Sequence, residues 1–89
     1  MDERQLRGEL ERLHAELRNS GSEDEGQRET LRALTADVEE LLGRQDSGPH
    51  HYMSLRERLR ESVAQLEASH PDATLLMRQL IDSLSYLGI

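Results

Sequence analysis

Apolar residues recur every three or four positions in four separate segments of this chain, which predicts four amphipathic helices. The segments are residues 2–18, 23–42, 55–68 and 71–87. In the first segment the leucines are separated by four, three and four positions, a spacing typical of the narrow seam of a coiled coil. The leucines of this seam are Leu6, Leu10, Leu13 and Leu17.

The other three segments carry broader apolar stripes, typical of helices that face a globular core. The stripes consist of Leu31, Leu34, Val38, Leu41 and Leu42; of Leu55, Leu59, Val63 and Leu66; and of Ala73, Leu76, Met77, Leu80, Leu84 and Leu87. In the last segment Leu75 and Tyr86 lie nearly opposite the main stripe. We therefore expect the last helix to present a second, smaller apolar strip.

Helix-breaking residues separate the four segments. Asn19-Ser20-Gly21 ends the first, and two glycines and a proline lie within residues 43–51. The chain is therefore predicted to be all-α, with four amphipathic helices arranged as two antiparallel helical hairpins in a small helical bundle. The prediction is a single domain, residues 1–89, with one hairpin at 2–43, a loop at 43–53 and a second hairpin at 54–89.

Pro71 determines how the second hairpin is expected to turn. Proline has no amide hydrogen to donate and disfavours a helical conformation at the preceding His70. A new helix is therefore expected to begin at Pro71, with Ser69 or His70 as its cap. The alternative is one kinked helix that continues through Pro71. At the end of the chain, Ile89 is expected to fold back on the last turn.

Two Ser-x-x-Glu patterns predict capping boxes, in which serine and glutamate satisfy the free amides at a helix start. They are Ser22 with Glu25, for the second helix, and Ser54 with Glu57, for the third. Gly43 is the expected C-terminal cap of the second helix.

Composition narrows the functional classes. Eighteen acidic and eleven basic residues, all of them arginine, give a net charge of −7, which opposes binding to nucleic acid or to anionic membranes. The absence of cysteine excludes disulfides and thiolate zinc sites. The N-terminus is charged, and no apolar run reaches the length of a membrane span. We therefore expect a soluble, cytoplasmic protein.

Histidines provide the candidate metal site. His50 and His51 beside Asp46 form the one plausible constellation, and it needs His14 or His70 as a further ligand. Adjacent histidines do not easily bind one ion from a regular element. We therefore expect a solvated loop here, with no metal and no cofactor.

Arginines are densest at Arg56, Arg58 and Arg60. At this spacing they spread around a helix instead of forming one stripe, and Glu57 and Glu61 are interleaved with them. The expected role is a solvated, ion-paired face; the alternative is a surface for an acidic partner. The sequence contains no phosphate-binding loop, nucleophile elbow or metalloprotease motif. An enzyme is not expected.

Four segments of the chain carry a further pattern: residues 6–17 (LRGELERLHAEL), 54–59 (SLRERL), 67–71 (EASHP) and 87–89 (LGI). Together they resemble a family of short bacterial proteins catalogued as domain of unknown function 4404. The resemblance spans nearly the whole chain, and its most specific parts are Ser69-His70-Pro71 and the Gly-Ile ending. The resemblance implies a small cytosolic helical protein of bacteria. It implies no activity, substrate or catalytic residue.

Two functional classes follow from these observations. The first is a non-enzymatic interaction or structural module that acts through helix–helix contacts, with an unknown protein partner or as a homodimer. The second is a helical protein that binds a metal or ligand through histidines. A small core without Phe or Trp favours self-association. The candidate interface residues are Leu75 and Tyr86, joined by Leu6, Leu10, Leu13 and Leu17.

Overall fold

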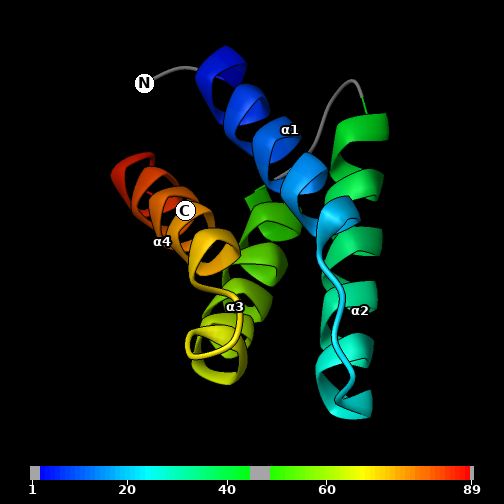
Figure 1. The fold of residues 1–89 in the computed structure, drawn as a ribbon. Coiled ribbons are helices and arrows are strands. Elements are labelled where there is room, and N and C mark those ends of the chain that lie inside the picture. The colour runs from blue at the N-terminus through cyan, green and yellow to red at the C-terminus, as the bar shows by residue number, and fades with distance from the viewer. Residues whose placement is uncertain (1–2, 45–48, 89) are drawn as a thin grey trace.

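The computed structural model describes residues 3–44 and 49–88 and contains four α-helices (Figure 1). The helices are α1 (Glu3–Asn19), α2 (Glu25–Gly43), α3 (Pro49–Leu66) and α4 (Pro71–Tyr86). No strand occurs among the described residues. The prediction of an all-α fold with four helices is therefore confirmed.

The helices form a closed four-membered arrangement. Each helix packs against the one that follows it in the chain, and α1 packs against α4 to complete the ring. Consecutive helices run in opposite directions, so that α1–α2 and α3–α4 are the two predicted hairpins (Figure 1). Each helix thus has two neighbours, and their apolar stripes meet in the centre of the bundle.

The core is almost entirely aliphatic. All four helices contribute to one cluster of buried side chains: Leu6, Leu10, Leu13, Leu17, Leu31, Leu34, Val38, Leu41, Leu55, Leu59, Leu66, Ala73, Met77, Leu80 and Leu84. Around it pack six half-buried residues: Leu42, Tyr52, Val63, Leu76, Ile81 and Leu87. Each fully buried leucine contributes roughly 1.5–3 kcal/mol relative to an exposed one, so burial of these stripes supplies the main force for folding.

Helix α3 begins earlier than the sequence pattern predicts. Its first residue is Pro49, whereas the predicted loop extended to residue 53. Proline suits the first helical position because its φ is already helical and its missing amide hydrogen is not needed there. The early start also brings Tyr52 against the core. Ser54 therefore lies within the helix, and the predicted capping box of Ser54 with Glu57 is wrong.

The N-terminus of α2 is capped by Asp24, so the predicted capping box of Ser22 with Glu25 is also wrong. A carboxylate oxygen of Asp24 accepts a hydrogen bond from the backbone amide of Gln27 at 2.9 Å. The Ser22 hydroxyl accepts from the Asp24 amide at 3.1 Å and donates to the Gln27 side chain. Ser22 thus supports the residue that caps the helix.

Carbonyl oxygens at the C-terminus of α2 accept hydrogen bonds from another helix. Gly43 is still helical, and Arg44 is the cap, so the predicted glycine cap is displaced by one residue. The Arg7 guanidinium of α1 donates to the carbonyl oxygens of Leu42 and Arg44. A cation at this end also complements the helix dipole.

At the end of α4, Gly88 has a φ of +81°, as expected after a helix. The predicted fold-back of Ile89 lies outside the described residues.

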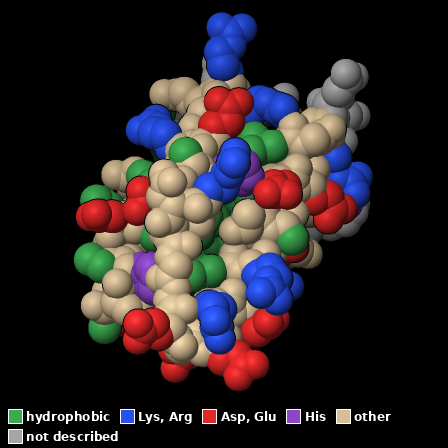
Figure 2. Space-filling view, turned by 45° about the vertical axis from the view of Figure 1, so that its right-hand side comes forward, with side chains coloured by type: hydrophobic (Ala, Val, Ile, Leu, Met, Phe, Trp, Pro, Cys, Tyr) green, Lys and Arg blue, Asp and Glu red, His purple; other side chains and the backbone are tan. Residues whose placement is uncertain are grey.

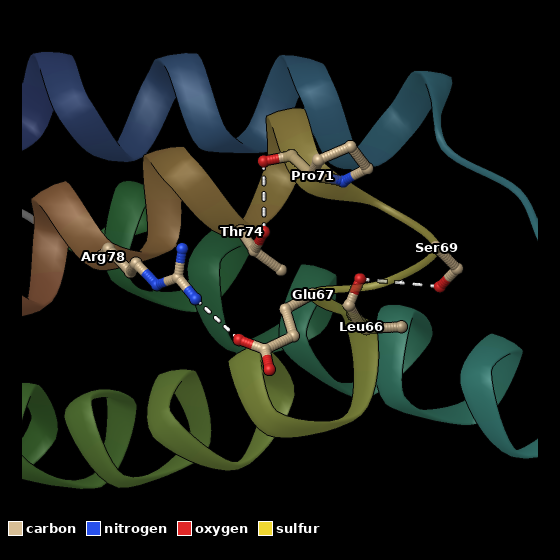
Figure 3. Close-up of polar contacts among 6 residues, drawn as sticks. All are labelled: Leu66, Glu67, Ser69, Pro71, Thr74 and Arg78. Atoms are coloured by element: carbon tan, nitrogen blue, oxygen red, sulfur yellow. Dashed lines mark hydrogen bonds and ion pairs between the residues drawn. The ribbon is translucent and has the colours of Figure 1, made fainter.

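The turn between α3 and α4 shows that these are two separate helices, not one kinked helix. Helix α3 ends at Leu66 and α4 begins at Pro71, and the His70 amide donates to the Leu66 carbonyl at 2.7 Å. His70 is the N-cap residue, but its side chain makes no capping hydrogen bond. Thr74 donates to the Pro71 carbonyl at 3.1 Å within the first turn of α4 (Figure 3).

Candidate functional site

The leucine seam of α1 lies inside the bundle, not on its surface. Leu6, Leu10, Leu13 and Leu17 are at most 4% exposed. Helices α2 and α4 flank α1 and cover the seam within the same chain. These four leucines, predicted as part of an interface between chains, are therefore taken up by the core of the chain itself. A second chain would reach them only if the bundle opened.

The outward face of α4 carries the other predicted interface residues. Leu75 is 54% exposed and Tyr86 is 79% exposed, and Met53 of α3 is the third large apolar side chain that is exposed among the described residues. Leu75 and Tyr86 are eleven positions apart, or about three helical turns, so they project from the same side of α4. The structure thus places both on a single helix face that points away from the core.

Polar residues occupy the stretch of this face between the two apolar ends. Arg78, Gln79 and Asp82 are all exposed there. One guanidinium nitrogen of Arg78, Nη2, lies 2.6 Å from Oε2 of Glu67, which links α4 to the end of α3 (Figure 3). We refer to Leu75, Arg78, Gln79, Asp82 and Tyr86 as the outer face of α4.

The histidines whose side chains are described lie in separate places. His14 of α1 contacts Glu39 of α2, with 3.1 Å between Nε2 and Oε1. His70 lies between the two hairpin turns, and His51 lies in the first turn of α3. Within residues 3–44 and 49–88, no three His, Asp or Glu side chains gather to hold a metal ion. Asp46 and the His50 side chain lie outside the described part of the chain, and with them most of the predicted constellation.

His70 joins the turns of the two hairpins. Its Nε2 lies 2.8 Å from the Gly21 carbonyl oxygen, which can only accept, so Nε2 carries the proton. Its Nδ1 lies 2.8 Å from the Ser69 hydroxyl, which is then the donor. This contact links residues far apart in the sequence.

Replacing His70 with alanine is expected to lower the free energy of unfolding by about 1 kcal/mol, because the hydrogen bond between the turns is lost. Urea denaturation followed by circular dichroism measures the change. His70→Gln retains a side-chain donor and should recover part of the loss. Equal losses for both variants would show that the Gly21 contact does not stabilise the fold.

A family profile described as "Domain of unknown function (DUF4404)" matches residues 6–89 of the chain. The chain belongs to this family. The match includes all of the residues on which the resemblance rests. Comparisons with curated proteins and with solved structures find no significant match. No helix in the described portion of this DUF4404 chain is long and apolar enough to cross a membrane.

One arginine of the cluster in this DUF4404 chain forms an ion pair with a carboxylate on another helix. Arg58 of α3 pairs with Asp37 of α2 and helps to join the two hairpins. Figure 2 shows basic and acidic side chains interspersed over the visible face, without a large basic area. This arrangement matches a solvated, ion-paired surface.

Glu40 and Arg44 form an exposed ion pair at the end of α2, with 2.8 Å between Oε1 and Nη2. The hydrogen bond and the charge of Arg44 lower the pKa of Glu40, with a smaller contribution from His51. Since the folded pKa is lowered, this contact favours folding at neutral pH and is lost as the pH falls through the lowered value. Because both side chains are exposed, this ion pair contributes little to the free energy of unfolding.

A shallow groove lies beside the turn between α1 and α2 and encloses about 490 Å³. Leu17, Leu31 and Ala36 contribute apolar surface to it, and Arg28 and Arg32 contribute charge. Leu17 and Leu31 are buried in the core, so the groove offers little free apolar area. The outer face of α4 therefore exposes the larger apolar side chains.

Proposed function

We propose that this DUF4404 chain is a non-enzymatic interaction module that associates with a second copy of itself through the outer face of α4. The observation that carries the proposal is the exposure of Leu75 and Tyr86 on one side of a single helix. Fifteen other apolar side chains are buried in the core, whereas these two large ones face outward. A symmetric contact would cover each of them twice, once per subunit.

The energetics favour a weak, reversible dimer. Fully burying one leucine contributes roughly 1.5–3 kcal/mol, and a two-fold contact buries two leucines and two tyrosines. Association opposes this gain through lost translational and rotational freedom. A single helix face is also smaller than the interfaces of most stable dimers. The small difference between the energy of burial and the cost of association fits a module that associates where its local concentration is high.

The placement of the polar side chains supports binding rather than catalysis. His14 contacts a carboxylate on the neighbouring helix and His70 contacts a backbone carbonyl. Both histidines therefore make contacts between helices or turns. General acid–base catalysis requires such a group beside a substrate pocket. The groove beside α2 is lined by neither of them. His70 lines a smaller hollow at the turn between α3 and α4, where its Nε2 already contacts the Gly21 carbonyl oxygen.

The double variant Leu75→Glu and Tyr86→Glu should remain monomeric at concentrations where the unaltered chain associates, because four carboxylates would meet across the interface. Sedimentation equilibrium from about 10 to about 500 µM measures the change, since the mass rises with concentration when dissociation constants lie in this range. Circular dichroism should show unchanged helicity.

A matched control places the same added charge on the other hairpin. Ala15→Glu with Ala36→Glu changes two exposed positions of α1 and α2. This control should associate as the unaltered chain does. If the unaltered chain keeps a mass near 10 kDa throughout the concentration range, the proposal of self-association is wrong.

A further inference from the structure

The outer face of α4 has a symmetric order of chemical types. Along the helix it presents an apolar residue, a base, an amide, an acid and a second apolar residue: Leu75, Arg78, Gln79, Asp82 and Tyr86. Read from the other end, the same face presents an apolar residue, an acid, an amide, a base and an apolar residue. An antiparallel copy therefore offers the complementary charge at each charged position.

The helix geometry places these complementary groups at matching positions along the helix axis. Leu75 and Tyr86 lie equally far from a point between residues 80 and 81, about 8 Å along the axis in each direction. A two-fold axis through that point places Leu75 of one chain opposite the partner's Tyr86. Along the helix axis, Arg78 then lies within the rise of one residue of the partner's Asp82.

The angular positions agree with this pairing. At 100° per residue, Arg78 and Asp82 lie on the same side of the line that joins Leu75 and Tyr86. When two antiparallel helices are related by a two-fold axis, the same flank of each helix meets across the contact. Arg78 therefore faces the flank that carries the partner's Asp82, and contact at both apolar ends requires a shallow crossing angle of about 20°.

We propose that two copies of this chain pair through antiparallel α4 helices, with Leu75 against the partner's Tyr86 and Arg78 bonded to the partner's Asp82. This arrangement rests on the proposed function and specifies its partner and geometry. In a parallel pair, opposite flanks of the two helices would meet, so Arg78 would lie away from the partner's Asp82 and this ion pair could not form. The Arg78–Asp82 contact thus requires the antiparallel orientation.

The contacts within the chain leave these two groups available. Asp82 has no ion-pair partner among the described residues. Arg78 holds Glu67 through one terminal nitrogen, while the other points away from Glu67 (Figure 3). A guanidinium has five N–H donors, so Arg78 can retain Glu67 and also donate to the partner's Asp82. The Glu67 contact already restricts the Arg78 side chain on this flank.

Cysteine crosslinking tests the orientation, because the chain has no cysteine of its own. Leu75→Cys and Tyr86→Cys are prepared separately and treated with a short bismaleimide, at concentrations where sedimentation shows that each variant associates. Antiparallel pairing predicts crosslinked dimers in the mixture of the two variants and none in either variant alone. Crosslinking of Leu75→Cys with itself would show parallel pairing and overturn this proposal, while self-association would stand.

Charge reversal tests the Arg78–Asp82 contact. Arg78→Asp alone and Asp82→Arg alone each create two like-charge pairs, and each should weaken association about tenfold or more. The double variant Arg78→Asp with Asp82→Arg restores opposite charges and should recover most of the affinity. If the double variant stays as weak as the single variants, the proposed contact is wrong.

The outcomes separate failure of the arrangement from failure of the proposed function. Association of the unaltered chain without crosslinks in the cysteine mixture would overturn the antiparallel arrangement alone. The absence of any association at about 500 µM would overturn the proposed function and, with it, this arrangement. Unchanged helicity of every variant by circular dichroism shows that each result reports association and not folding.

Discussion

Replacing Leu13 with alanine is expected to remove about 3–5 kcal/mol from the free energy of unfolding. Leu13 is fully buried in the middle of the α1 seam, and truncation of such a leucine loses its burial energy and leaves a cavity. A domain of 89 residues has a total stability of about 4–13 kcal/mol. This one substitution should therefore remove a large fraction of the stability, and urea denaturation at 25 °C measures it.

The same experiment shows whether the α1 seam serves the fold or an interface. Because the seam is buried within one chain, the loss caused by Leu13→Ala should not depend on protein concentration. Leu75→Ala, at an exposed position of α4, is the matched control and should change the stability of the monomer by less than about 0.5 kcal/mol. A loss at Leu13 that disappears in dilute protein would place the seam between chains instead.

Replacing Ser83 with alanine is expected to lower the free energy of unfolding by about 1–3 kcal/mol. The Ser83 hydroxyl is buried and lies 2.9 Å from Oε1 of Glu9 and 3.0 Å from the Gln79 carbonyl oxygen. It connects α4 to α1 across 74 positions of sequence. Without it, Oε1 of Glu9 loses this hydrogen bond, and the other carboxylate oxygen, Oε2, is already buried with no partner in the described structure. An unsatisfied buried acceptor is more costly than a hydrogen bond is favourable.

Removing the Glu9 carboxylate should abolish the destabilisation that Ser83→Ala causes. Glu9→Met replaces the carboxylate with a flexible apolar side chain, and the Ser83 hydroxyl retains the Gln79 carbonyl as its acceptor. We expect Glu9→Met to be stabilising by about 1 kcal/mol and Ser83→Ala to be nearly neutral in that background. A double-mutant cycle by urea denaturation measures the coupling, and additive effects of the two substitutions would contradict it.

The number and position of the helices follow from the spacing of apolar residues. Four stripes at intervals of three and four predict four helices, and the structure contains them. The exposure of Leu75 and Tyr86 follows from the same wheel, because both lie opposite the main stripe of α4. Pro71 separates α3 from α4 through its missing amide hydrogen, which is a property of the residue itself. These predictions succeed because they depend on local geometry.

Helix starts were predicted less well, because several residues near each start can serve as caps. Ser22 and Asp24 are both suitable N-cap residues, and the chain uses Asp24, with Ser22 in support. Pro49 is compatible with a loop and with the first turn of a helix. The chain adopts the helical alternative, in which Tyr52 contacts the core. This contact exists only in the folded bundle.

By itself, the sequence determined four amphipathic helices, the break at Pro71 and the apolar stripe that each helix buries. The tertiary structure alone decided what covers each stripe, because a coiled-coil spacing is satisfied equally by helices of the same chain and by those of another. It covers the α1 seam with α2 and α4, and it brings Gly21 to His70 and Glu9 to Ser83. Such contacts depend on how helices distant in the sequence pack, which the periodicity of any one helix does not specify.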